Sequence, residues 1–326
     1  MARLAASQNN GRSLEKALSI LTISLIFGQQ LKFGICAYNW EPFSYTPRLF
    51  EELARETEAL NYDSFFVTDH FLRPHAPKDL TVKQNATLEA WTLLANLAAK
   101  TSRIRLGTCV TPMPLRKPEI LAKMVATVDI LSEGRVILGV GAGWDKPEFE
   151  VYGSWYSDGE RVERTREGIE LVKKLWTEDV ADYDGKYYKA KGAICEPKPV
   201  QKGGPPVWLG AIHDKMLKLT GDLADAWFPG RAVGATIEHY AASVPKIKEE
   251  ASKVGRKTPL LSLMGYFVEP NASLALPAIA TMDKAAEMVQ KYRDLGCEYM
   301  AVMFFPVTKF KEMMRSFSRD VVPSFS

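Results

Sequence analysis

The sequence is poor in the residues that build metal cages and disulfide frameworks. Its 326 residues include only four cysteines and four histidines, and no two cysteines form a C-x-x-C pair. This pattern argues against a zinc site, so we expect no metal. Three of the cysteines stand beside apolar residues in strand-like segments, and we interpret these as reduced, buried thiols. A chain of this length can bury one large apolar core without such cross-links. Reduced thiols also fit a reducing compartment.

The sequence also lacks a strong excess of charge of either sign. Lysine and arginine number 42 and the acidic residues 39, which leaves a net charge of +3, and no dense basic cluster is present. Proteins that bind nucleic acid usually concentrate basic residues on one face or helix. We therefore expect no nucleic-acid partner.

Long hydrophobic runs are missing too. The run that is most similar to a membrane-spanning or signal segment lies within residues 1–30. Two basic residues precede an apolar run over residues 17–28, which is similar to a signal peptide. The run is too short to span a bilayer, and polar residues follow it instead of a small-x-small cleavage site. We interpret residues 1–30 as an N-terminal extension, helical or signal-like, and expect a cytoplasmic protein with no membrane partner.

From Phe33 onward, short apolar runs alternate with amphipathic stretches, as in parallel strands joined by crossover helices. Eight strands is the number at which such a barrel closes on a filled interior. Residues 31–326 are therefore predicted to form one domain of the α/β class, a TIM (β/α)8 barrel. Strands are expected over residues 33–38, 64–68, 103–110, 135–140, 207–209, 226–228, 260–267 and 299–304. Helices are expected over residues 47–60, 88–100, 118–131, 160–176, 215–221, 237–254 and 282–295.

One segment interrupts this alternation. Residues 181–199 place Asp184-Gly185 between tyrosine-rich arms, a pattern typical of a β-hairpin. We interpret the segment as an insertion on the barrel and not as a second domain.

Unusual residues follow several of the predicted strands, where TIM barrels carry their chemistry. Asp69, His70 and Phe71 follow the second strand. Histidine is the side chain best suited to exchange a proton near neutral pH, and a neighbouring carboxylate can orient it or tune its titration. An ordinary solvated loop histidine is the alternative, but the strand-end position favours a catalytic role.

Small residues follow the third, fourth and fifth strands. The glycines of residues 139–143 free backbone amides for an anion or a flat ring, although they lack the third glycine of a dinucleotide fingerprint. The helix after the fifth strand offers amides to a phosphate, but Asp214 would cap that helix equally well. Trp40 and Trp227 could wall an apolar pocket, although core packing is the commoner use of tryptophan.

At these residues the chain resembles the luciferase-like superfamily of flavin- and coenzyme F420-dependent oxidoreductases, over about residues 33–304. The most specific stretch is LGTCVTPMPLRKPEILAKMVATVDILSEGRVILGVGAGWDKPEFEVYG. The phrases DSFFVTDHF, DGKYYKAKGAICEPKPVQ and PPVWLGA belong to the same pattern. The resemblance implies a luciferase-like TIM barrel with the hairpin insertion near its cofactor rim.

The resemblance also implies the residues of the site. Family members often carry a non-proline cis peptide under the deazaflavin, and the matching bond here is Cys109–Val110. Asp69 and His70 match a pair at the active site of several deazaflavin-dependent members. We therefore expect His70 to transfer a proton, and Asp69 to orient the His70 ring and contact the cofactor. Aromatic residues are expected to line the substrate pocket. The implied cofactor-binding residues are Asp69, Cys109, Val110, Thr111, Gly141, Ala142, Gly143, Trp144, Gly210, Ala211 and Ile212, and the substrate pocket would be lined by Trp40, Phe71 and Trp227.

The run Asp69-His70-Phe71 and the stretch LEAWTLLANLAA look most like the deazaflavin branch of this superfamily. We therefore expect an oxidoreductase that transfers a hydride between coenzyme F420 and a small organic substrate, and the resemblance implies a homodimer. Trp144 and Asp145 stand where the sugar-phosphate enzymes usually carry a glutamate, which disfavours a sugar phosphate. One alternative is a monooxygenase that uses reduced FMN and oxygen and is supplied by a separate flavin reductase. Another is a non-catalytic cofactor-binding barrel.

Overall fold

The computed structural model describes residues 30–40, 47–74, 86–230, 236–270 and 279–325. The expected N-terminal extension therefore lies almost wholly outside the described residues. Within them, no helix combines the length and the apolar character needed to cross a lipid bilayer.

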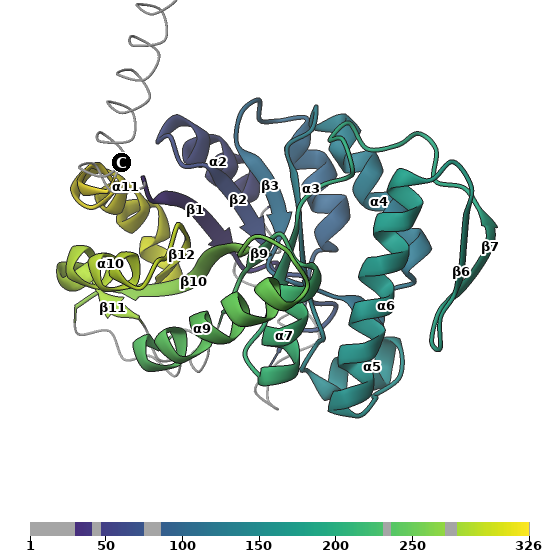
Figure 1. The fold of residues 1–326 in the computed structure, drawn as a ribbon. Helices are drawn as coiled ribbons and strands as arrows, with labels where there is room; N and C mark the ends of the chain where they lie inside the picture. Colours follow the sequence, from purple (N-terminus) through teal and green to yellow (C-terminus); the bar gives the residue numbers. More distant parts are fainter. Residues whose placement is uncertain (1–29, 41–46, 75–85, 231–235, 271–278, 326) are drawn as a thin grey trace, which may run out of the picture.

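Eight parallel strands form a closed barrel at the centre of the molecule (Figure 1). Each strand pairs with the next around the ring, and the pairing of β9 with β10 and of β12 with β1 closes it. The predicted TIM barrel is therefore confirmed. Its strands are β1 (Lys32–Ala37), β2 (Ser64–Val67), β3 (Arg105–Thr108), β5 (Val136–Gly141), β8 (Val207–Gly210), β9 (Ala226–Trp227), β10 (Leu260–Val268) and β12 (Tyr299–Phe305). Two short strands extend the pairing, β4 (Thr111–Pro112) beside β5 and β11 (Ala280–Thr281) beside β10.

The barrel interior is filled by side chains and is not a channel. The Trp208 ring of β8 lies 5.5 Å from that of Phe66 on β2 and 4.9 Å from that of Tyr299 on β12, measured between ring centroids. Strand β5, with the sequence VILGVG, is buried along its whole length. A continuous apolar run of this kind is typical of a strand covered on both faces, as a barrel strand is.

Helices surround the strands (Figure 1). Most follow the predicted ranges, and α4 begins at Pro118 because proline suits the first helical turn. Two helices were not predicted, α5 (Lys146–Tyr152) and α11 (Phe310–Asp320). Helix α11 packs Phe310 and Phe317 on Phe304 of β12. The α-helices are α2 (Pro47–Ala59), α3 (Ala90–Ala98), α4 (Pro118–Leu131), α5 (Lys146–Tyr152), α6 (Asp158–Thr177), α7 (Asp214–Leu223), α9 (Ile237–Lys253), α10 (Ala285–Asp294) and α11 (Phe310–Asp320). Short 3-10 turns cover Met113–Leu115, Met282–Lys284, Val307–Lys309 and Val322–Ser324.

The predicted hairpin is present as β6 (Ala181–Asp184) and β7 (Lys189–Ala193). It lies at the outer edge of the barrel beside α6 (Figure 1). Glu167 of α6 holds its turn, since the Glu167 carboxylate accepts hydrogen bonds from the backbone N–H groups of Lys186, Tyr187 and Tyr188 at 2.9, 2.8 and 3.0 Å. The segment is an appendage of the single barrel, as expected.

Candidate active site

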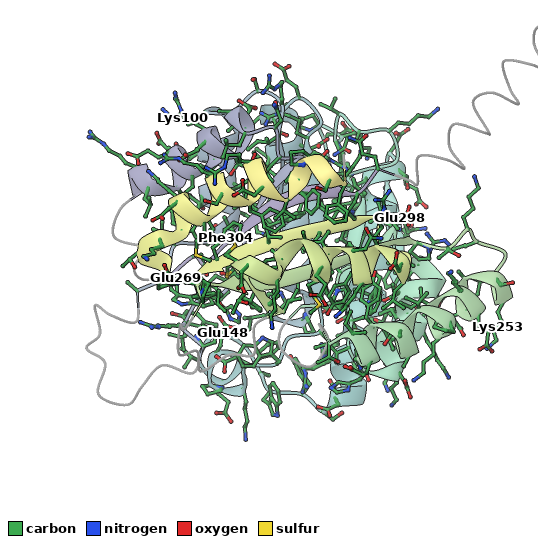
Figure 2. All side chains as sticks on the ribbon, turned by 90° about the vertical axis from the view of Figure 1, so that its left-hand side faces the viewer. Lys100, Glu148, Lys253, Glu269, Glu298 and Phe304 are labelled. Carbon is green, nitrogen blue, oxygen red and sulfur yellow. The ribbon has the colours of Figure 1, made fainter. Side chains whose placement is uncertain are left out.

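The chemistry-bearing residues gather at the carboxyl ends of the strands. Figure 2 shows Phe304, at the end of β12, on the same side of the molecule as Glu148, whereas Glu298, just before β12, lies at the opposite end. Glu148 belongs to α5, the short helix that follows β5. This rim is where a TIM barrel places its active site.

His70 lies on this rim between two tryptophans. Its ring centroid is 5.6 Å from that of Trp40 and 5.7 Å from that of Trp144, and both contacts are edge-to-face. Trp40 in turn stacks on Tyr38 at 4.0 Å between ring centroids. The His70 side chain retains 14% exposure. The structure thus brings together three residues that sequence analysis assigned to proton transfer, substrate and cofactor.

The carboxylate that meets His70 is Glu148. Its Oε2 lies 3.0 Å from His70 Nδ1, and its Oε1 accepts hydrogen bonds from the backbone N–H groups of Phe71 and Leu72. Glu148 is 1% exposed, so its carboxylate is hydrogen-bonded to the loop of residues 70–72 and hardly reaches water. Sequence analysis missed it because it lies 78 residues from His70 on a helix that was not predicted.

Asp69 does not orient the His70 ring, contrary to expectation. Its buried carboxylate accepts hydrogen bonds from Thr111 Oγ1 at 2.7 Å and from Arg116 Nε and Nη2 at 3.1 and 2.6 Å. Successive side chains of an extended segment point to opposite sides, so adjacency in sequence separates these two. Asp69 therefore joins the end of β2 to the start of β4.

Arg116 connects Asp69 to a second carboxylate, that of Glu89, at 2.8 Å. Burial alone would raise the pKa of Glu89, but its hydrogen bonds with Thr92 and the charge of Arg116 outweigh burial and lower that pKa. Glu89 also caps α3 through the backbone N–H groups of Trp91 and Thr92. The Asp69–Arg116–Glu89 cluster thus ties two strand-end segments to the start of a helix.

Asn39 fixes the backbone of the His70 loop. Its fully buried side-chain amide donates to the carbonyl oxygens of His70 and Leu88 at 2.8 and 2.7 Å. The hydroxyl of Thr68 donates to Asn39 Oδ1 and accepts from the Asn39 backbone N–H, both at 2.9 Å. Sequence analysis passed over Asn39, although an asparagine at the end of a buried strand was a readable signal, because buried amides need partners.

The predicted cofactor segments of β3, β5 and β8 meet at Val110. The Cys109–Val110 peptide is cis, as the resemblance implied. A Cβ added at Gly141 or Gly210 would lie 2.7 or 3.0 Å from Val110 Cγ2, so these two glycines leave room for the valine side chain. The three segments are therefore packed into one contiguous surface, with Thr111 buried beside it.

Gly143 redirects the chain from β5 into α5. Its φ is +77°, and an added Cβ would lie 2.3 Å from the ring of Phe149, so both backbone and packing require glycine. Ala142 before it is half-buried, and Trp144 after it is exposed. This turn brings both Trp144 and Glu148 into contact with the same histidine.

Helix α7 begins directly after the Gly210–Ile212 segment. Its N-cap residue is His213, which makes no side-chain capping bond, and Asp214 bonds to Lys246 at 2.7 Å, so the alternative that Asp214 caps the helix is not what the structure shows. Lys215 stands in the first turn. The positive end of a ten-residue helix, with no side-chain cap and with a lysine in its first turn, suits a phosphate group.

Trp227 is not placed to line a substrate pocket, which corrects the sequence-based expectation. It is fully buried, and its ring packs on Tyr240 of α9 at 4.7 Å between centroids. Its Nε1 donates to the carbonyl oxygen of Ala211 at 2.9 Å. Alternation along β9 directs this side chain to the helix layer, where it supports the Gly210–Ile212 segment from behind.

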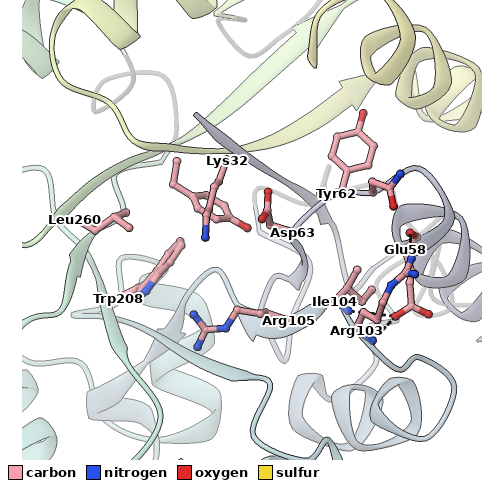
Figure 3. A pocket seen from close by; sticks show the side chains of 11 residues that line it. Lys32, Glu58, Tyr62, Asp63, Arg103, Ile104, Arg105, Trp208 and Leu260 are labelled. Carbon is pink, nitrogen blue, oxygen red and sulfur yellow. Dashed lines mark hydrogen bonds between the residues drawn. The ribbon is translucent and has the colours of Figure 1, made fainter. Parts of the chain in front are cut away.

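A cavity of about 340 Å³ opens at the other end of the barrel, where the strands begin. Figure 3 shows Lys32, Asp63 and Arg105 around it, with Trp208 and Leu260. Burial raises the pKa of Asp63 even though its carboxylate accepts a hydrogen bond from the Phe33 N–H at 3.0 Å. None of the predicted site residues lines this cavity, and this face of a TIM barrel ordinarily serves stability. The candidate active site is therefore the opposite rim.

Comparison with known proteins identifies the family. A family model described as luciferase-like monooxygenase matches residues 34–314, so the chain belongs to the luciferase-like family. F420-dependent glucose-6-phosphate dehydrogenase of Nocardia farcinica is 29% identical over 86% of this chain and 94% of its own length. The enzyme of that name from Mycolicibacterium fortuitum is 33% identical over 76% and 72%. The solved structure of an F420-dependent secondary alcohol dehydrogenase with an F420–acetone adduct covers 91% of this chain and 99% of its own, at 20% identity and a TM-score of 0.78.

Proposed function

We propose that this protein is an oxidoreductase that transfers a hydride between coenzyme F420 and a small organic substrate. The observation that carries the proposal is the setting of His70, one ring nitrogen of which faces Glu148 while the ring stands between Trp40 and Trp144 on the rim. Membership of the luciferase-like family and the F420-dependent relatives support the choice of cofactor.

The residues present fit such a cofactor. The contiguous surface formed by Cys109–Thr111, Gly141–Trp144 and Gly210–Ile212 would hold it, and the start of α7 would bind its phosphate. Bound F420 supplies a ring that accepts or donates a hydride. Asp69 acts through Thr111 and Arg116, by fixing the shape of this surface.

His70 carries the proton in this mechanism. When an alcohol is oxidised, its hydroxyl proton passes to His70 as the hydride leaves the adjacent carbon, and in the reduction of a carbonyl the proton returns. Trp40 and Trp144 contact the His70 ring edge-to-face. The Phe71 ring packs on Tyr152 at 5.0 Å between ring centroids and lies beneath the Arg116 guanidinium. Holding the reactants in one geometry supplies much of the remaining rate.

For the substrate we propose a neutral alcohol or carbonyl compound. Two relatives are named for glucose 6-phosphate. The family resemblance implies a glutamate directly after the glycine loop in sugar-phosphate enzymes, and this chain has Trp144 and Asp145 there. We further propose a homodimer, as the family resemblance implies. The four buried, unpaired cysteines support a cytoplasmic location.

Anaerobic titration of the apoprotein with F420 and, separately, with FMN tests the cofactor through ligand fluorescence. Tight binding of F420 alone supports the proposal. Tight binding of FMN alone refutes it and makes oxygen uptake with a flavin reductase the next assay. Once turnover is found, His70→Ala is expected to lower kcat by about 10²–10⁴-fold while F420 affinity changes little. Unchanged kcat would remove His70 from the mechanism.

A further inference from the structure

We infer that Glu148 is a positioning residue that fixes the tautomer of His70, so that Nδ1 carries the hydrogen and Nε2 exchanges the substrate proton. The chemical role of Nε2 rests on the proposed function, whereas the tautomer itself depends only on the contacts of these two side chains.

The hydrogen bonds of Glu148 determine which nitrogen of His70 carries the hydrogen. An ionised carboxylate only accepts hydrogen bonds, so a ring nitrogen 3.0 Å from it must carry a hydrogen. The other carboxylate oxygen already receives the N–H groups of Phe71 and Leu72, which fixes the rotation of the carboxylate and directs Oε2 at the ring. Asp69 cannot take this place, because Arg116 and Thr111 hold its oxygens.

The other ring nitrogen, Nε2, is left to face the substrate. His70 Nε2 has no hydrogen-bond partner within the described part of the chain, and the side chain remains 14% exposed. With Nδ1 protonated, Nε2 of the neutral ring has a free lone pair. The Asn39 bond to the His70 carbonyl and the two flanking indoles hold the ring in place, so this lone pair has a defined direction.

Glu148→Gln makes a sharp test because the two oxygens of Glu148 have different partners. The glutamine oxygen is expected to occupy the Oε1 position and keep the Phe71 and Leu72 bonds, which places its NH2 group against Nδ1. An NH2 group only donates hydrogen bonds, so Nδ1 must become the acceptor and the hydrogen must move to Nε2. Shape and burial stay nearly constant while the tautomer changes.

The readout is ¹⁵N NMR of the histidine side chains in the protein without cofactor, at a pH where the rings are neutral. The chain has four histidines, and His70→Asn assigns the signal. We expect Nδ1–H in the wild type and Nε2–H in Glu148→Gln. The matched control is Glu150→Gln on the same helix, whose partner is Lys146 and whose side chain is 56% exposed, and it should leave the signal unchanged. An Nε2–H tautomer in the wild type, or an unchanged tautomer in folded Glu148→Gln, overturns the inference.

Kinetics then separate this inference from the proposed function. Glu148→Gln is expected to lower kcat by about 10²–10⁴-fold, the range of general acid–base catalysis, with F420 affinity nearly unchanged. A changed tautomer with unchanged kcat would support the structural assignment and refute proton transfer by Nε2. A loss of cofactor affinity equal to the loss of kcat would show that Glu148 only holds the loop.

Discussion

Replacing Asp69 by asparagine tests whether the Asp69–Arg116–Glu89 cluster stabilises the rim. The change keeps the shape of the side chain but removes a charge that is 2% exposed and that accepts one hydrogen bond from Thr111 and two from Arg116. Removing one partner of a buried ion pair costs about 3–5 kcal/mol, because the other charge stays buried. Arg116 keeps Glu89, so we expect the lower end, about 3 kcal/mol.

Urea unfolding measures this change through the free energy extrapolated to water, and calorimetry should show a fall in Tm of roughly 5 °C for a chain of this size. The control is Asp158→Asn, which also removes an aspartate bound to an arginine, here Arg161 at 2.7 Å, but with a side chain that is 95% exposed. Asp158 stays in water in the folded protein, and Arg161 keeps its bond to the Tyr156 carbonyl oxygen at 2.6 Å, so we expect a smaller loss of stability than for Asp69→Asn. If Asp69→Asn destabilises the protein no more than Asp158→Asn does, the Asp69–Arg116–Glu89 cluster does not stabilise the rim.

Two further changes test other parts of the structure. Burial raises the pKa of the Asp63 carboxyl, so the folded protein binds the carboxyl proton more tightly than the unfolded chain does. The free energy of unfolding therefore falls as the pH rises above the pKa of an aspartate in the unfolded chain, about 3.9. Asp63→Asn should therefore unfold at a higher urea concentration than the wild type at pH 7, and at the same concentration as the wild type below about pH 4. Equal urea midpoints at pH 7 would show that burying the ionised Asp63 carboxylate does not destabilise the protein. Trp227→Phe keeps an aromatic ring packed on Tyr240 but loses the hydrogen bond to the Ala211 carbonyl oxygen. We expect the free energy of unfolding to fall by about 1–2 kcal/mol. We also expect weaker binding of F420 and an unchanged KM for the substrate. A changed KM at full stability would return Trp227 to the substrate pocket.

The barrel could be predicted because its signals are local. Helix α4 has a proline at its first position and an apolar periodicity, and its predicted and observed bounds, Pro118–Leu131, coincide. Helix α11 carried a comparable signal, with Phe310, Met313, Met314 and Phe317 one turn apart on one face, and was overlooked. Helix α5 is different, since seven residues are too few to show a helical period.

The site could be predicted only in part, because its key contacts are not local. The Asp69-His70 dipeptide suggested a working pair, but the structure pairs His70 with Glu148 and Asp69 with Arg116. These partners lie 78 and 47 residues away, and no spacing rule on one chain connects them. Trp227 was misplaced for a related reason, because a strand of two residues is too short to reveal which side faces the interior.

The segment Gly141–Glu148 carries both a predicted cofactor-binding stretch and the carboxylate bound to His70. A ligand that displaces the Gly141–Trp144 end would therefore also displace Glu148 and the imidazole that it contacts. Thermodynamic linkage makes such coupling reciprocal, so a change at the Glu148–His70 contact alters ligand affinity by the same factor. In this arrangement, the ¹⁵N signals of the His70 ring, followed during a titration with F420, report on cofactor binding before any substrate is present.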